Sequence, residues 1–177
     1  NKSGADMYDG TLVMIVPGSP VQGNRVAVQP MIADGTYPAD YIVGVLTNDL
    51  PNNQEGLATW FGYVRNINKT HLVPAGETWA EGDILYPHPT LAGYMTHTTP
   101  TAPNVKSTIA VVTTINGNNV TLMVRPSLRG RLDTLHNVTI ESASYGDLLV
   151  RNHGGGDIWI NSKQLSGSYS ITGSLNA

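Results

Sequence analysis

The stretch His153-Gly154-Gly155-Gly156 is the most suggestive catalytic pattern in the chain. In some hydrolases such a stretch supplies backbone N–H groups to an oxyanion hole. It works there with a nucleophilic serine on a Gly-x-Ser-x-Gly turn between a strand and a helix. No such pentapeptide occurs in the 177 residues. We therefore interpret the glycines as a hairpin turn between residues 148–150 and 158–160, and predict that the chain is not an enzyme.

The other side chains that could carry chemistry are scattered. The five histidines lack the spacing of a zinc ligand set, and cysteine is absent. Enzymes that cleave glycans use paired carboxylates, for which the candidates are Asp49 with Glu55, and Glu77 with Glu81 and Asp83. Both groups lie in segments rich in turn formers and are expected to be solvated. The sequence thus predicts no catalytic residue, no metal site and no cofactor.

Aromatic side chains offer a third kind of site, because their rings stack on sugars. Trp79, Tyr86 and Tyr94 lie near predicted loops and are expected to be exposed. They are the candidate glycan contacts. The aromatic residues of the segment 57–64 belong instead to a predicted strand with one face in the core.

The elements that position these residues are predicted to be strands. Charged residues make up 13% of the chain, about half the usual share, and glycine and proline number 19 and 11. Residues 11–16, 25–29, 41–46 and 57–64 form apolar or alternating runs that end at turn formers. In residues 108–124, two β-branched runs flank Asn-Gly-Asn, which predicts an antiparallel hairpin.

The net charge is −3, and no basic run or basic helix occurs, so nucleic-acid binding is not expected. No apolar run reaches the length of a transmembrane helix, and we expect no membrane insertion. The composition changes near residues 125–133. We predict a β-rich domain over residues 1–127, a short module over 128–161 and a Ser/Gly-rich tail over 162–177.

The first of these domains resembles a recurring domain of tailed-bacteriophage virion structural proteins. The resemblance rests on four motifs in the family's order. They are NKSG at residue 1, GVLTND followed by NNQEG and FGYVR over 44–65, EGDILY with LAG and PTAPN over 81–104, and the closing hairpin.

Residues 135–161 resemble the short modules that chain along phage tail and head fibres. The shared pattern comprises Leu135, Val138, Ile140, Ser142, Gly146-Asp147, Leu149-Val150, Trp159 and Asn161. His136-Asn137 replaces the family's usual pair before the valine. The tail after residue 161 is similar to the Ser/Gly-rich repeats that continue such fibres.

This resemblance implies an all-β fold: a β-barrel or sandwich-like domain followed by a small β-hairpin module of a trimeric fibre. A module of about 27 residues is too small for a stable core of its own, so three copies are expected to bury their apolar residues together. The candidate trimer interface is Val138, Ile140, Leu149, Val150, Ile158 and Trp159.

The implied function is structural, as a homotrimeric tail fibre subunit of a virion assembled in the bacterial cytoplasm. Its implied partners are other tail or capsid proteins and a host cell-surface glycan. A head fibre or capsid decoration protein uses the same modules and stays open as an alternative. A glycan-binding or glycan-degrading adhesin is the alternative from a different class.

Overall fold

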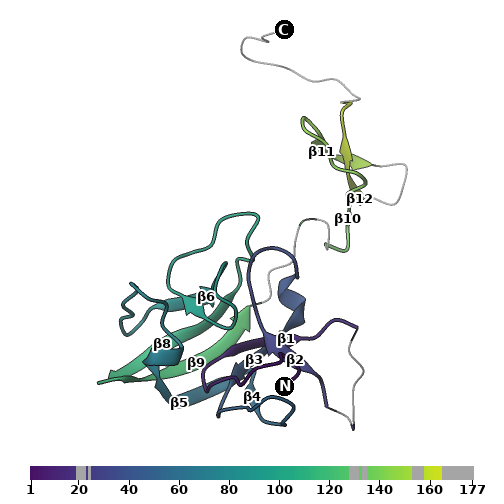
Figure 1. The fold of residues 1–177 in the computed structure, drawn as a ribbon. Helices are drawn as coiled ribbons and strands as arrows, with labels where there is room; N and C mark the ends of the chain where they lie inside the picture. Colours follow the sequence, from purple (N-terminus) through teal and green to yellow (C-terminus); the bar gives the residue numbers. More distant parts are fainter. Residues whose placement is uncertain (19–22, 24, 128–131, 133–134, 153–157, 165–177) are drawn as a thin grey trace. The chain divides into compact units, whose positions relative to one another are not determined.

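The chain separates into two compact units, Asn1–Arg129 and Gly130–Ala177. Apart from two single-turn 3-10 helices, η1 (Ala39–Tyr41) and η2 (Lys69–His71), the regular structure of the described residues is strand. The fold is therefore all-β (Figure 1). The computed structural model describes all residues except 19–22, 24, 128–131, 133–134, 153–157 and 165–177.

Two antiparallel sheets form the first unit. The four-stranded sheet has the order β2-β1-β3-β4, with β1 (Leu12–Ile15), β2 (Val28–Pro30), β3 (Ile42–Leu46) and β4 (Ala58–Thr59). The five-stranded sheet has the order β5-β9-β8-β6-β7, with β5 (Gly62–Asn68), β6 (Ile84–Pro87), β7 (Met95–Thr96), β8 (Thr108–Asn116) and β9 (Asn119–Ser127). Neither sheet closes on itself among the described residues, so the unit is sandwich-like rather than a barrel.

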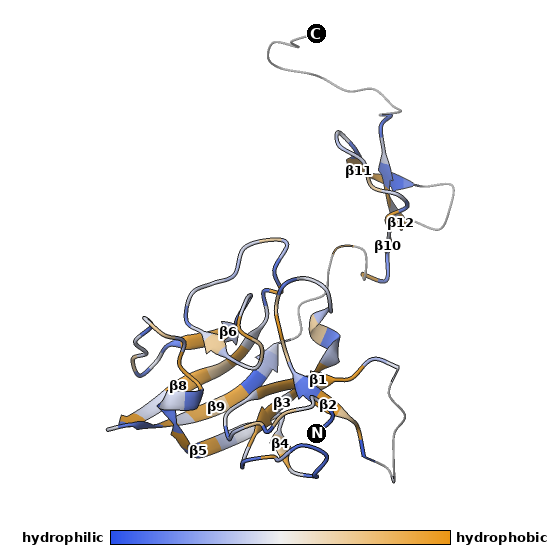
Figure 2. Cartoon of the chain, in the orientation of Figure 1, coloured by the Kyte–Doolittle hydropathy of each residue, from blue (hydrophilic) through white to orange (hydrophobic). Residues whose placement is uncertain are grey.

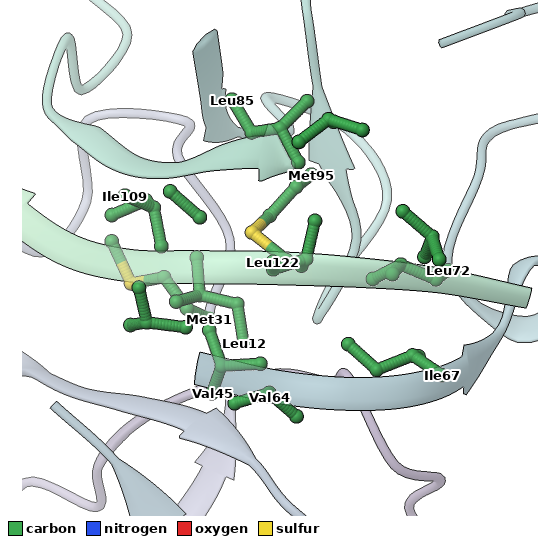
Figure 3. Close-up of a cluster of buried hydrophobic side chains, with 14 of the residues drawn as sticks. Leu12, Met31, Val45, Val64, Ile67, Leu72, Leu85, Met95, Ile109 and Leu122 are labelled. Carbon is green, nitrogen blue, oxygen red and sulfur yellow. The ribbon is translucent and has the colours of Figure 1, made fainter. Parts of the chain in front are cut away.

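The main core lies between these two sheets (Figure 3). Leu12 of β1 and Val45 of β3 meet Val64 of β5 and Leu122 of β9 in one buried cluster. Each fully buried side chain of this size is worth about 1.5–3 kcal/mol before entropy is subtracted. Because strand side chains alternate between faces, this cluster uses one face of each sheet and leaves the other free for different contacts.

The predicted hairpin over residues 108–124 is confirmed as β8 and β9, which pair from Asn116↔Asn119 to Thr108↔Ser127. Gly117 in the connecting turn has a φ of 58°, a backbone conformation that side chains with a Cβ rarely adopt. Apolar residues recur along both strands, as Figure 2 shows. Local turn chemistry and β-branched runs therefore identified this hairpin without any tertiary information.

The single strand predicted over residues 57–64 is wrong in one respect. The segment is divided between β4 and β5, which belong to different sheets, and Trp60 and Phe61 lie at the crossing. Gly62, with a φ of 129°, turns the chain into the second sheet. As a result Trp60, Phe61 and Tyr63 are all exposed, and the prediction that one face of this segment is core fails for them.

Candidate functional site

The second unit contains one small sheet with the order β10-β12-β11. Its strands are β10 (Val138–Thr139), β11 (Leu148–Asn152) and β12 (Ile158–Ser162). β10 runs parallel to β12, whereas β11 and β12 form the predicted antiparallel hairpin. Residues 153–157, which include the His-Gly-Gly-Gly stretch predicted to form the hairpin turn, lie outside the described residues. We call this unit the fibre module, after the sequence resemblance described above.

Asn161 connects three segments of the fibre module. Its Oδ1 accepts a hydrogen bond from the Glu141 N–H (2.9 Å), and its Nδ2 donates to the Glu141 carbonyl (2.8 Å). The same Nδ2 donates to Oδ2 of Asp147 (2.8 Å). These two opposed hydrogen bonds to the backbone of Glu141 fix the approach of residue 141 to β12, as strand pairing would.

Asp147 closes the turn before β11. Its Oδ2 also accepts the Ser144 N–H (2.9 Å), while Gly146 adopts a φ of 87°. The hydrogen bond from the Asn161 side chain, followed by that from the Ser144 backbone, lowers the pKa of Asp147 below its ordinary value. The Gly-Asp and Asn positions of the sequence pattern therefore have a structural role, which is to hold the turn and β12 together.

The candidate interface residues are divided between the two faces of this sheet. Directly paired residues share a face, so the pairs Arg151↔Trp159 and Val138↔Trp159 place Trp159 with Val138. Alternation adds Leu149 to this face and assigns Val150 and Ile158 to the opposite one. The sixth candidate, Ile140, follows the end of β10 and is half-buried.

Both faces of this small sheet carry partly exposed apolar side chains, yet the unit has no second layer among its described residues. Leu149 is 42% exposed and Trp159 is 38% exposed, and of the described apolar residues only Val138 is buried. A half-exposed tryptophan beside an exposed leucine is typical of the central part of a protein interface. The geometry therefore favours burial of these faces against another molecule.

Replacing Asn161 by alanine is expected to loosen the fibre module. Three hydrogen bonds are lost, each worth about 0.5–1.5 kcal/mol net, and the Glu141 N–H and carbonyl lose their partner. Hydrogen exchange should show faster exchange at the Glu141 amide. The exposed Gln164→Ala is the matched control in the same unit. Unchanged protection of the Glu141 amide in Asn161→Ala would contradict this role.

The candidate glycan contacts differ in exposure. Trp79 is only 5% exposed and packs in the main core, so the expectation that it is exposed is wrong. Its indole N–H donates to Oε2 of Glu77 (3.2 Å), which allows the ring to be buried with its polar atom paired. A buried ring offers no face to a sugar. Tyr86 and Tyr94 are half-buried.

The carboxylates considered for catalysis have structural partners. Glu55 pairs with Arg25 (2.6 Å), and Oε1 of Glu77 accepts the Thr96 hydroxyl (2.6 Å). Glu81 accepts the N–H of Ile115 (2.9 Å). Asp83 accepts the Ala80 N–H and lies 3.5 Å from Nδ1 of His97. The described residues contain no group of three or more acidic or histidine side chains that could hold a metal ion.

The structure brings together one acidic pair that the spacing did not suggest. Oδ1 of Asp49 accepts the backbone N–H of Asp9 (3.0 Å), and the ring of His71 stacks on that of Tyr8 with centroids 3.9 Å apart. Burial, and then the neighbouring Asp49 carboxylate, raise the pKa of Asp9 above its ordinary value of 3.8. Forty residues separate the two aspartates, so no local pattern could have indicated the pair.

Replacing Asp9 by asparagine is expected to stabilise the first unit near pH 7. The pKa of Asp9 is higher in the folded protein than in the unfolded chain, so ionisation of Asp9 lowers the free energy of unfolding. This loss develops as the pH rises from the ordinary pKa of the carboxyl group through its raised pKa in the fold. With screening by solvent, the gain stays below about 1 kcal/mol. Urea unfolding should show this gain near pH 7 and none near pH 3, where both states are protonated. A destabilised Asp9→Asn at pH 7, or an equal gain in the exposed control Asp40→Asn, would contradict this prediction.

A cleft of about 860 Å³ lies on the side of the four-stranded sheet that faces away from the main core. Val28, Leu46 and Leu50 contribute to its apolar lining, and they belong to a second buried cluster. The exposed ion pair between Arg25 and Glu55 lies at its rim. Among the described residues that line it none is aromatic, so they offer no stacking surface for sugars.

Among the described residues, neither short helix is long and apolar enough to cross a membrane. No family model, curated protein or solved structure matches the chain. The assignment of a site therefore depends on the geometry of the fibre module. Its exposed apolar faces, held by the Asn161 and Asp147 hydrogen bonds, are the best-supported functional surface.

Proposed function

We propose that this chain is a structural subunit of a bacteriophage virion, a homotrimeric tail fibre protein of the host-adsorption apparatus. The observation that carries the proposal is the single-layer sheet of the fibre module, which carries partly exposed apolar side chains on both faces. A sheet of this kind in a soluble unit needs partners, and identical copies are always available in a fibre. The assignment to a phage particle comes from the sequence motifs.

The two apolar faces favour a ring over a two-fold dimer. A two-fold contact uses one patch twice, so it would leave the second face of the sheet in water. In a ring, one face of each copy contacts the other face of its neighbour, so both faces of the sheet are buried. Leu149 and Trp159 on one face would then meet Val150 and Ile158 of the next copy, and three copies are the number that the fibre motifs imply.

The proposal gives the chain no catalytic role. The carboxylates considered for catalysis accept hydrogen bonds from backbone N–H groups or from the side chains of Arg25, Thr96 and Trp79, as described above. Its partners would be neighbouring tail proteins and a cell-surface glycan of the host. A head fibre or capsid decoration protein would use the same module, and the two locations differ only in the part of the particle to which the chain attaches.

The location can be tested on phage particles that carry this sequence. Gold-labelled antibodies against the purified chain should decorate the tail fibres in electron micrographs. Label on the head would support the decoration protein instead. Particles without label, with the chain absent from their mass spectra, would contradict a virion role.

The adhesin alternative is weaker in one respect, because Trp79 is buried. It retains the half-buried Tyr86 and Tyr94. A glycan array with the purified chain, combined with an assay for released reducing sugar, separates the possibilities. Saturable binding without product would favour an adhesin, and product release would favour a depolymerase.

A further inference from the structure

The outer face of the five-stranded sheet carries a continuous apolar row. Strand pairing aligns Tyr63 of β5 with Met123 of β9, Met123 with Val111 of β8, and Val111 with Ile84 of β6. We call these four residues the outer row. Paired residues share a face, and the residues that alternate with them point into the core. The row therefore crosses four strands on the side facing away from the four-stranded sheet.

The residues at the two ends of the outer row are exposed to solvent. Tyr63 is 51% exposed and Ile84 is 46% exposed, while Val111 and Met123 are half-buried. Within the described residues of the first unit, no second layer buries this face. The exposed Phe61 follows the crossing from β4 and adds another apolar side chain close to the Tyr63 end. Contiguous apolar surface of this kind marks sites of association.

The charges around the outer row differ between its two ends. Arg65 lies on β5, with its guanidinium carbon 4.8 Å from the centre of the Tyr63 ring, and the exposed Arg125 lies on the adjacent β9. At the opposite end, Glu81 and Asp83 directly precede Ile84. One end is basic and the other acidic, so the two ends of this surface complement each other.

A surface that is basic at one end and acidic at the other fits a second copy of itself. We infer that the outer row is an interface between copies of this chain, with Arg65 of one copy facing Glu81 of the next. This inference rests on the proposed homotrimer and extends it to the first unit. Around a threefold axis, the β5 edge of each sheet would meet the β6 side of its neighbour, while Met123 and Val111 face the axis.

The chain offers a direct test because it contains no cysteine. Arg65 and Glu81 lie on opposite sides of β9 and β8, more than about 10 Å apart at 4.8 Å per strand. A disulfide needs Cα atoms within about 7 Å, so Arg65→Cys with Glu81→Cys cannot bridge within one copy. Mild oxidation of the full chain carrying both substitutions should give covalent dimers and trimers on a non-reducing gel.

The control is Asp40→Cys with Glu55→Cys, two exposed positions in segments next to the four-stranded sheet, which should stay largely uncross-linked. An oligomeric chain whose Arg65 and Glu81 cysteines do not cross-link would overturn the inference and leave the proposed function standing. A chain that is monomeric at all concentrations would overturn both. Saturable oligosaccharide binding that is lost in Tyr63→Ala, without cross-linking, would reassign the row to glycan.

Charge reversal gives an independent readout. Arg65→Glu should weaken self-association about fivefold per contact, the upper end for an exposed ion pair. Adding Glu81→Arg should restore it, because the two charges exchange places across the interface. If Arg65→Glu has no effect, or the double variant is weaker still, the proposed pairing of the two ends is wrong.

Discussion

Replacing Trp159 by alanine is expected to dissociate the proposed trimer. Trp159 shares a face of the fibre module with Val138 and Leu149, and its side chain is more than a third exposed in the single chain. Truncating a tryptophan at the centre of an interface costs about 2 kcal/mol or more, and three copies lose it at once. Light scattering over a dilution series should show dissociation at protein concentrations at least about thirtyfold higher than for the unaltered chain.

Tyr145→Ala is the matched control for this experiment. Tyr145 is an aromatic residue of the same unit, lies fully exposed in the turn before β11, and is not part of either sheet face. It should leave the mass unchanged. Leu149→Ser removes a second member of the Trp159 face and should weaken assembly in the same direction. Trp159→Ala protein that keeps its assembled mass on dilution would contradict the interface.

Replacing Gly44 by alanine is expected to destabilise the first unit by about 3 kcal/mol or more. Gly44 lies in β3 with a φ of 144°, and a Cβ there would overlap the backbone carbonyl of Thr59 in β4. Val45 and Leu46 pair with β4, so the clash can be relieved only by separating the two strands. Urea unfolding of the variant should show a lower midpoint.

Gly76→Ala is the control that separates the steric clash of an added Cβ from the strain of a positive φ. Gly76 also has a positive φ (88°), but a Cβ there would meet no atom within 4 Å. It should cost only the conformational strain, about 1–3 kcal/mol at most. If Gly44→Ala and Gly76→Ala were equally destabilising, the close approach of β3 and β4 would not be the cause.

Local signals were sufficient for much of the fold. The Asn-Gly turn between β-branched runs predicted β8 and β9, and the apolar run of residues 11–16 predicted β1. These elements are defined by neighbours in the sequence, so periodicity and turn chemistry can identify them. The pairing of β10 with β12 is different, because it is parallel and joins residues about 20 positions apart.

Contacts between distant segments set the limits of prediction. The crossing at Trp60 and Phe61 depends on two sheets meeting, and a pattern within residues 57–64 cannot show it. Trp79 looked like a loop residue because proline and glycine surround it. Its burial depends on Glu77 and on core residues from both sheets.

In the fibre module too, local sequence signals predicted the strands but not the contacts between distant residues. The predicted hairpin strands of residues 148–150 and 158–160 are present as β11 and β12, but the assignment of the apolar candidates to two opposite faces required the register. The sequence pattern included Gly146, Asp147 and Asn161 but did not indicate what these residues do in the structure. The hydrogen bonds of Asn161 to Glu141 and Asp147 supply that reason.

The mass of the full chain in solution tests the central claim most directly. Light scattering or sedimentation equilibrium at micromolar concentration should give about three times the single-chain mass of 18.9 kDa. The value should fall toward that of one chain in Trp159→Ala or on strong dilution. A mass of one chain at every concentration would contradict a fibre that assembles through these two apolar faces.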